Sequence, residues 1–264
     1  MLALIFLVWA FGISVADSAH DSLSHDLLDR VLQSFVDENG LVAYKDLKAR
    51  PDDLTSYVAL LALYSPENAP EKFGSAEDRL AYWLNAYNAQ VLLSVVEAYP
   101  VKSVRDIKWF YGFFNRIGHR VGGREYTLKH IENEIIRKRF PDPRIHAALN
   151  CASMGCPKLP QTAYRGATLE HDLDAHMRIF LREPRNVRID RQANQIFLSD
   201  ILRTFQADFT PGYPHGDRVV NPTILDYLKL FVAQSDIDFL GSHPDIKIIY
   251  LKYDWRLNGQ GASR

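Results

Sequence analysis

Apolar residues recur at helical spacing over much of this 264-residue chain. Side chains three and four positions apart share one face of an α-helix, so this spacing predicts helices that bury one face in a core. The pattern predicts helices over residues 24–36, 54–64, 75–99, 127–140, 168–182, 201–209 and 224–232.

Short apolar runs bounded by turn residues predict strands between these helices. We expect a hairpin over 119–126 around Gly122-Gly123, a second hairpin over 187–198, and a terminal strand over 246–251. The run Ile145–Leu149 is also consistent with a buried strand. Helices come first and the strands are mostly in hairpins, which favours an α+β fold.

The helix that begins at Ser75 is apolar on nearly every side, which predicts that it is buried. Ser75 followed by Asp78 resembles a capping box, with Asp in place of the usual Glu. Asn85 and Asn88 lie three residues apart, on one face of this helix. A buried amide without a partner costs about 1–3 kcal/mol, so both asparagines must bond either neighbouring loop carbonyls or a substrate.

The expected architecture is a single domain over residues 20–264, with this buried central helix packed on a small, mostly antiparallel sheet. The aromatic-rich segment Lys102–Arg116 is either a loop or short helix packed on the core or one wall of a cleft. With 31 basic and 32 acidic residues and no apparent basic stripe, the chain gives no indication of nucleic acid as a partner.

Residues 2–11 form an uncharged apolar run that is followed by small residues. This pattern predicts a signal peptide over residues 1–19, cleaved after Ala16 or Ala19, and hence a periplasmic or extracellular protein. No Lys or Arg precedes the run, and it is shorter than the roughly 20 residues of a membrane span. An oxidising compartment would allow a disulfide between Cys151 and Cys156.

Several sequence motifs resemble those of the family called "domain of unknown function 547". Residues 82–88, Tyr-Trp-Leu-Asn-Ala-Tyr-Asn, resemble its Phe-Trp-Ile-Asn-x-Tyr-Asn motif. Residues 131–137 are similar to its Ile-Glu-His-x-Ile-Leu-Arg segment, and residues 146–157 to its His-Phe-Ala-Leu-Asn-Cys-Ala-Ser-x-Gly-Cys-Pro block. Residues 208–209 and 253–258 fit its later motifs.

The resemblance covers Leu41 to Asn258 and implies no settled activity. The chain departs from the family pattern at Asn133, where histidine is usual, and at Phe205, where tyrosine is common. Because asparagine replaces histidine at position 133, any hypothesis that this position holds a metal ligand or a base is weakened.

The first functional hypothesis is a non-enzymatic binding or scaffold module with a polar pocket for a small-molecule or peptide ligand. A polar cluster inside a core is more often structural than catalytic, which favours this hypothesis. The residues expected to contact the ligand are Asn85, Asn88, Asn150, Ser153, Asp208 and Asp254.

The second hypothesis is a cysteine-dependent acyl transferase or peptide hydrolase, of the papain or transglutaminase kind. Cys151 would be the nucleophile, His146 the base and Glu132 a candidate to orient the histidine. Two features disagree: residues five apart on a strand face opposite sides, and papain-like enzymes place the nucleophile at the start of the central helix. These features argue against such an enzyme. A distant likeness to the papain or transglutaminase fold, with the central helix retained but without its thiol, remains an alternative.

The third hypothesis is thiol–disulfide redox chemistry at Cys151 and Cys156, although their Cys-x4-Cys spacing differs from the Cys-x-x-Cys of thioredoxin-like sites. No metal site or cofactor is expected. His171 and His176 miss the i, i+4 spacing of helical zinc ligands, and the sequence contains no glycine-rich phosphate loop.

Overall fold

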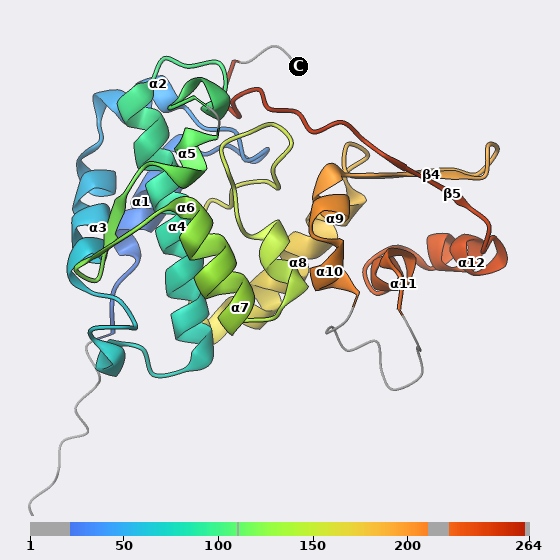
Figure 1. The fold of residues 1–264 in the computed structure, drawn as a ribbon, viewed down its shortest axis with the longest axis horizontal. Coiled ribbons are helices and arrows are strands. Elements are labelled where there is room, and N and C mark those ends of the chain that lie inside the picture. Colours follow the sequence, from blue (N-terminus) through green and yellow to red (C-terminus); the bar gives the residue numbers. More distant parts are fainter. Residues whose placement is uncertain (1–21, 110, 211–221, 262–264) are drawn as a thin grey trace, which may run out of the picture.

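A computed structural model describes residues 22–109, 111–210 and 222–261 (Figure 1). The predicted signal peptide lies outside these ranges. Within them, no helix has the length and apolar character needed to cross a membrane.

The centre of the N-terminal part is the long helix α4 (Ala76–Ala98), which packs against other helices (Figure 1). Its capping box is confirmed: the Ser75 hydroxyl accepts a bond from the Asp78 N–H at 3.0 Å, and the Asp78 carboxylate accepts one from the Ser75 N–H at 3.1 Å. Almost every residue from Leu80 to Val96 is buried, as the apolar pattern predicted. The elements before it are α1 (Asp26–Phe35), α2 (Tyr44–Ala49), α3 (Asp52–Leu63) and η1 (Pro70–Lys72).

The chain from α4 to the cysteines consists of short helices and a short hairpin. They are η2 (Val104–Asp106), α5 (Gly112–Asn115), β1 (His119–Val121), β2 (Arg124–Tyr126), α6 (Leu128–His130), the π-helical turn η3 (Ile131–Ile136), α7 (Arg137–Arg139) and the 3-10 helix η4 (Pro143–Ala147). The predicted β1–β2 hairpin is confirmed, with Gly122 and Gly123 in the left-handed turn (φ 55° and 79°). Its Tyr126 ring meets Trp83 of α4 edge-on at 6.0 Å, so the central helix does contact this hairpin.

The C-terminal part carries a three-stranded sheet at the far end of the molecule (Figure 1). Strand β4 pairs antiparallel with β3 and parallel with β5. The elements are η5 (Gly166–Thr168), α8 (Leu169–Arg182), β3 (Val187–Asp190), β4 (Gln195–Leu198), α9 (Asp200–Thr204), α10 (Gln206–Phe209), α11 (Ile224–Lys229), α12 (Gln234–Ser242) and β5 (Lys247–Tyr250).

Within the described ranges the buried apolar side chains form two clusters, and α8 contributes to both of them. Leu169 and Leu173 pack in the cluster around α4, whereas Met177 and Phe180 pack in the cluster beside the sheet. The fold is thus α+β, as predicted, and α8 joins its two halves.

The predicted strand at Ile145–Leu149 is wrong, because residues 143–147 form the 3-10 helix η4. Pro143 fixes a φ suited to the first helical turn, and the Asp142 carboxylate accepts a bond from the Arg144 N–H at 2.8 Å. Periodicity cannot separate a short buried strand from a short buried helix. The apolar pattern also did not predict α2 or α12. α2 has six residues, too few for a clear apolar repeat, and α12 buries Leu240 alone among its nine residues.

Candidate functional site

A cavity of about 220 Å³ lies where α4, η3, η4, the cysteine loop and the segment after β5 meet. Six aromatic side chains from the described part of the chain line it: Tyr87, Tyr111, Phe114, Phe205, Tyr253 and Trp255. Its polar lining includes the carboxyl groups of Glu132 and Asp200, the imidazole of His146 and both cysteines. Among the described residues, no lysine or arginine lines this cavity.

Glu132 projects from the π-helical turn η3, a conformation that often occurs at functional sites. The Tyr87 hydroxyl donates a hydrogen bond to its carboxylate at 3.4 Å. Burial raises the pKa of Glu132 from 4.5 to about 7, although the positive charge of Arg137 acts to lower it. Since the guanidinium of Arg137 binds Asp208 instead, Glu132 has no ion-pair partner among the described residues.

His146 is almost fully buried, with 4% of its surface exposed, and its ring stacks on Phe205 at 4.1 Å. Its Nε2 lies 2.7 Å from the Asp208 carboxylate, to which Arg137 also donates two bonds, at 2.6 and 2.8 Å. Burial lowers the pKa of His146 despite this carboxylate. The neutral ring therefore donates from Nε2 to Asp208, and its Nδ1 lone pair has no partner in the described part of the chain.

Asp208 keeps its charge at all ordinary pH values. Burial by itself would raise the pKa of Asp208, but the bonds from His146 and Arg137 outweigh it and hold that pKa well below its usual value.

Cys151 and Cys156 are joined in a disulfide, as the sequence suggested for an oxidising compartment. The Tyr253 hydroxyl lies 3.0 Å from each sulfur. Asn150 shapes the loop: its side chain accepts from the Ala152 N–H at 2.8 Å and donates to the Pro157 carbonyl at 2.7 Å. Both cysteines of the chain are in this bond, so neither is a free nucleophile in this state.

The two asparagines of α4 hold neighbouring loops through their amide groups. Asn85 exchanges two bonds with the backbone of Tyr164, at 2.8 and 2.9 Å. Asn88 donates to the Ala148 carbonyl at 3.0 Å and accepts from the Asn150 N–H at 2.9 Å. The amides thus fix the backbone on either side of the cysteine loop.

Residues 71–181 match the family described as "Protein of unknown function, DUF547". This match supports the resemblance to the DUF547 family that the sequence motifs indicated. The matched DUF547 region includes Glu132, His146 and both cysteines, whereas Asp208 and the cavity residues Tyr253 and Trp255 lie beyond it. Comparisons with curated proteins and with solved structures find no match.

The structure brings three of the predicted site residues together, because Glu132, His146 and Cys151 line one cavity. Asp208 lies behind His146 and bonds it. Asn150, Ser153 and Asp254 line a neighbouring pocket of about 680 Å³ instead, and Asn85 and Asn88 are not among the lining residues of the cavity. Whether any of these residues contacts a ligand stays a prediction.

Sequence reasoning missed most of the aromatic wall. The aromatic-rich segment Lys102–Arg116 does supply one wall of the cavity, through Tyr111 and Phe114, as one of its two interpretations predicted. Tyr87, Tyr253 and Trp255 stood in recognised motifs, but no local pattern indicates that such distant rings converge.

Proposed function

We propose that this protein is a binding module outside the cytosol, and that its cavity takes a small cationic ligand, an alkylammonium group. The observation that carries the proposal is the carboxyl of Glu132, which accepts a bond from Tyr87 but has no ion-pair partner among the described residues, inside a cavity lined by aromatic rings. Aromatic faces attract cations, and more strongly where water is excluded. The Cys151–Cys156 bond supports a periplasmic or extracellular location.

Charge balance favours a cation over an anion or a neutral ligand. Glu132 and Asp200 are the acidic groups that the described lining contains. Asp200 is ion-paired with Arg203, whereas Glu132 has no ion-pair partner among the described residues. An ammonium group beside Glu132 would stabilise the ionised carboxylate and lower its pKa again. Binding near neutral pH would therefore release a proton from Glu132.

Titration with tetramethylammonium, followed by tryptophan fluorescence, tests this proposal, since Trp255 lines the cavity. We expect saturable binding that is at least about tenfold tighter than that of neutral tert-butanol, which has a similar shape. Acetate serves as the anionic control and should not bind. Equal affinity for the neutral and the cationic probe would contradict the proposal.

A second candidate function is acyl transfer by the reduced protein, and one observation favours it. His146, oriented by Asp208, lines the same cavity as Cys151. After a dithiol reduces the disulfide, Nδ1 of His146 could take the Cys151 proton. The thiolate would attack an acyl carbonyl carbon, and the protonated imidazole would return the proton to the leaving group.

Alkylation with iodoacetamide tests this second candidate. Before reduction we expect no labelling, and intact mass should show a species two hydrogens lighter than the dithiol form. After reduction, an activated Cys151 should react at neutral pH faster than free cysteine, and His146→Gln should slow it by about tenfold or more. If Cys151 is alkylated more slowly than free cysteine, the acyl-transfer hypothesis is contradicted. Disulfide redox at Cys151 and Cys156 would then be the remaining thiol chemistry.

A further inference from the structure

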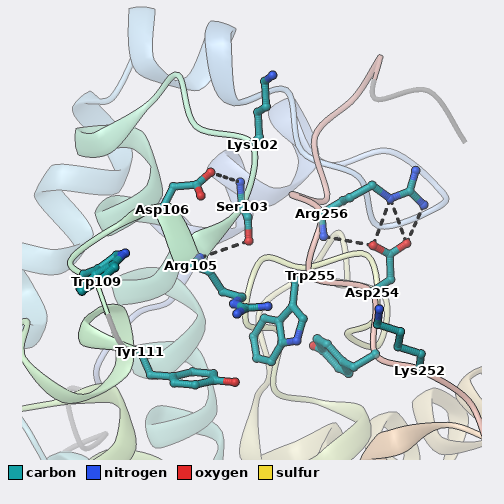
Figure 2. A pocket seen from close by; sticks show the side chains of 11 residues that line it. Lys102, Ser103, Arg105, Asp106, Trp109, Tyr111, Lys252, Asp254, Trp255 and Arg256 are labelled. Atoms are coloured by element: carbon teal, nitrogen blue, oxygen red, sulfur yellow. Dashed lines mark hydrogen bonds and ion pairs between the residues drawn. The ribbon is translucent and has the colours of Figure 1, made fainter.

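A larger hollow lies outside the cavity, on the other side of a shared aromatic wall. It is an open groove of about 980 Å³ between residues 102–109, together with Tyr111, and the extended segment 252–256. Tyr111, Tyr253 and Trp255 line both the groove and the inner cavity. Figure 2 shows Arg105 and Tyr111 reaching from one wall towards Trp255 on the other.

The groove carries positive charge that its own acidic residues do not neutralise. Lys102, Arg105 and Lys252 form no ion pair with any described residue. Of the two carboxylates in the lining, Asp254 is bound by Arg256, and Asp106 accepts a bond from the Ser103 N–H at 3.0 Å. The three unpaired cations thus attract an anionic ligand.

Aromatic rings project into the same groove from a strained backbone. Trp109 is 76% exposed, which is unusual for so large an apolar side chain. Lys108 and Tyr111 on either side of it are left-handed, with φ of 50° and 55°, although neither is glycine. Strain of this kind is often found at ligand-binding sites. Arg105 lies 5.7 Å from the centre of the Trp255 ring.

The segment 252–256 also has an unused hydrogen-bonding edge. The carbonyls of Asp254 and Arg256 accept bonds from the N–H groups of Gly155 and Met154, at 2.9 and 2.7 Å. The backbone N–H and C=O groups of the alternate residues Tyr253 and Trp255 bond no described residue. An extended segment with one free edge can pair with a peptide, as in β-strand addition.

We propose that this groove binds an acidic peptide segment in extended conformation. The peptide backbone pairs with Tyr253 and Trp255, its carboxylates meet Lys102, Arg105 and Lys252, and an apolar side chain packs on Trp109. Acidic polysaccharides and nucleic acids share the charge, but they lack the alternating N–H and C=O groups that match the free edge. The proposal is independent of amine binding in the inner cavity.

Fluorescence anisotropy with a dye-labelled peptide of alternating glutamate and valine tests the proposal. We expect saturable binding that weakens with salt, and no binding of the lysine–valine counterpart. Lys252→Glu should weaken binding by about tenfold or more, whereas Lys45→Glu, an exposed lysine on α2, should leave it unchanged.

N-methylation of alternate peptide amides separates backbone pairing from charge alone. We expect the methylated acidic peptide to lose affinity by about tenfold or more, because it cannot pair with the free edge. Equal binding of the methylated peptide, of oligogalacturonate or of single-stranded DNA would overturn the proposal. So would peptide binding that Lys252→Glu leaves intact.

Discussion

Replacing Glu132 by glutamine is expected to weaken ammonium binding by about one to two orders of magnitude and, at the same time, to stabilise the folded protein above about pH 7. Burial raises the pKa of Glu132 from 4.5 to about 7. The folded state therefore holds this proton more tightly than the unfolded state, and the free energy of unfolding falls as pH rises through that window. One pKa unit corresponds to about 1.4 kcal/mol, so we expect a gain of about 1–3 kcal/mol for the variant at alkaline pH.

Urea unfolding of both proteins at about pH 5 and about pH 8 measures this effect. The stability difference between Glu132→Gln and the parent should grow with pH and be small on the acidic side. Glu134→Gln is the matched control, because Glu134 is exposed on the same turn and pairs with Lys138. It should show no such gain. A stability difference between Glu132→Gln and the parent that does not change with pH would mean that burial does not raise the pKa of Glu132.

The second large effect is expected at Asn88, whose replacement by alanine should destabilise the fold by about 2–4 kcal/mol. The Asn88 amide is 4% exposed and bonds the Ala148 carbonyl and the Asn150 N–H. Alanine would leave both backbone groups buried without a partner, and each costs about 1–3 kcal/mol. Because these groups flank the cysteine loop, ammonium binding should weaken as well.

Thermal or urea unfolding of Asn88→Ala measures the loss. Asn115→Ala is the control: Asn115 is exposed at the end of α5, and its removal should change stability by no more than about 0.5 kcal/mol. A change of that small size at Asn88 would show that water or local rearrangement satisfies both backbone groups.

The sequence predicted those parts of the structure whose signals are local. The Ser75–Asp78 box, the continuous apolar run of α4 and the Gly122-Gly123 turn each depend on neighbouring residues only. The partners of Asn85 and Asn88 followed from a general rule, since buried amides must be bonded. The prediction of a strand at Ile145–Leu149 was wrong because a short run of buried residues fits a strand and a 3-10 helix equally well.

The sites could be predicted only in part, because they consist of residues far apart in the chain. His146 and Cys151 were predicted as site residues because they stand in one motif. Tyr87, Phe205 and Trp255, in contrast, come together only in the folded protein. The charge of the outer groove was also hidden. Its cations come from two segments more than a hundred residues apart, and the nearly neutral total of 31 basic and 32 acidic residues gave no sign of it.

The pH dependence of tetramethylammonium affinity tests the central claim most directly, because this cation does not titrate. If Glu132 is the anionic partner, affinity should rise by about one to two orders of magnitude between about pH 5 and about pH 8. The midpoint should lie near 7, where burial places the pKa of Glu132, and Glu132→Gln should show no rise. Binding that does not change with pH, or an equal rise in the glutamine variant, would contradict the account.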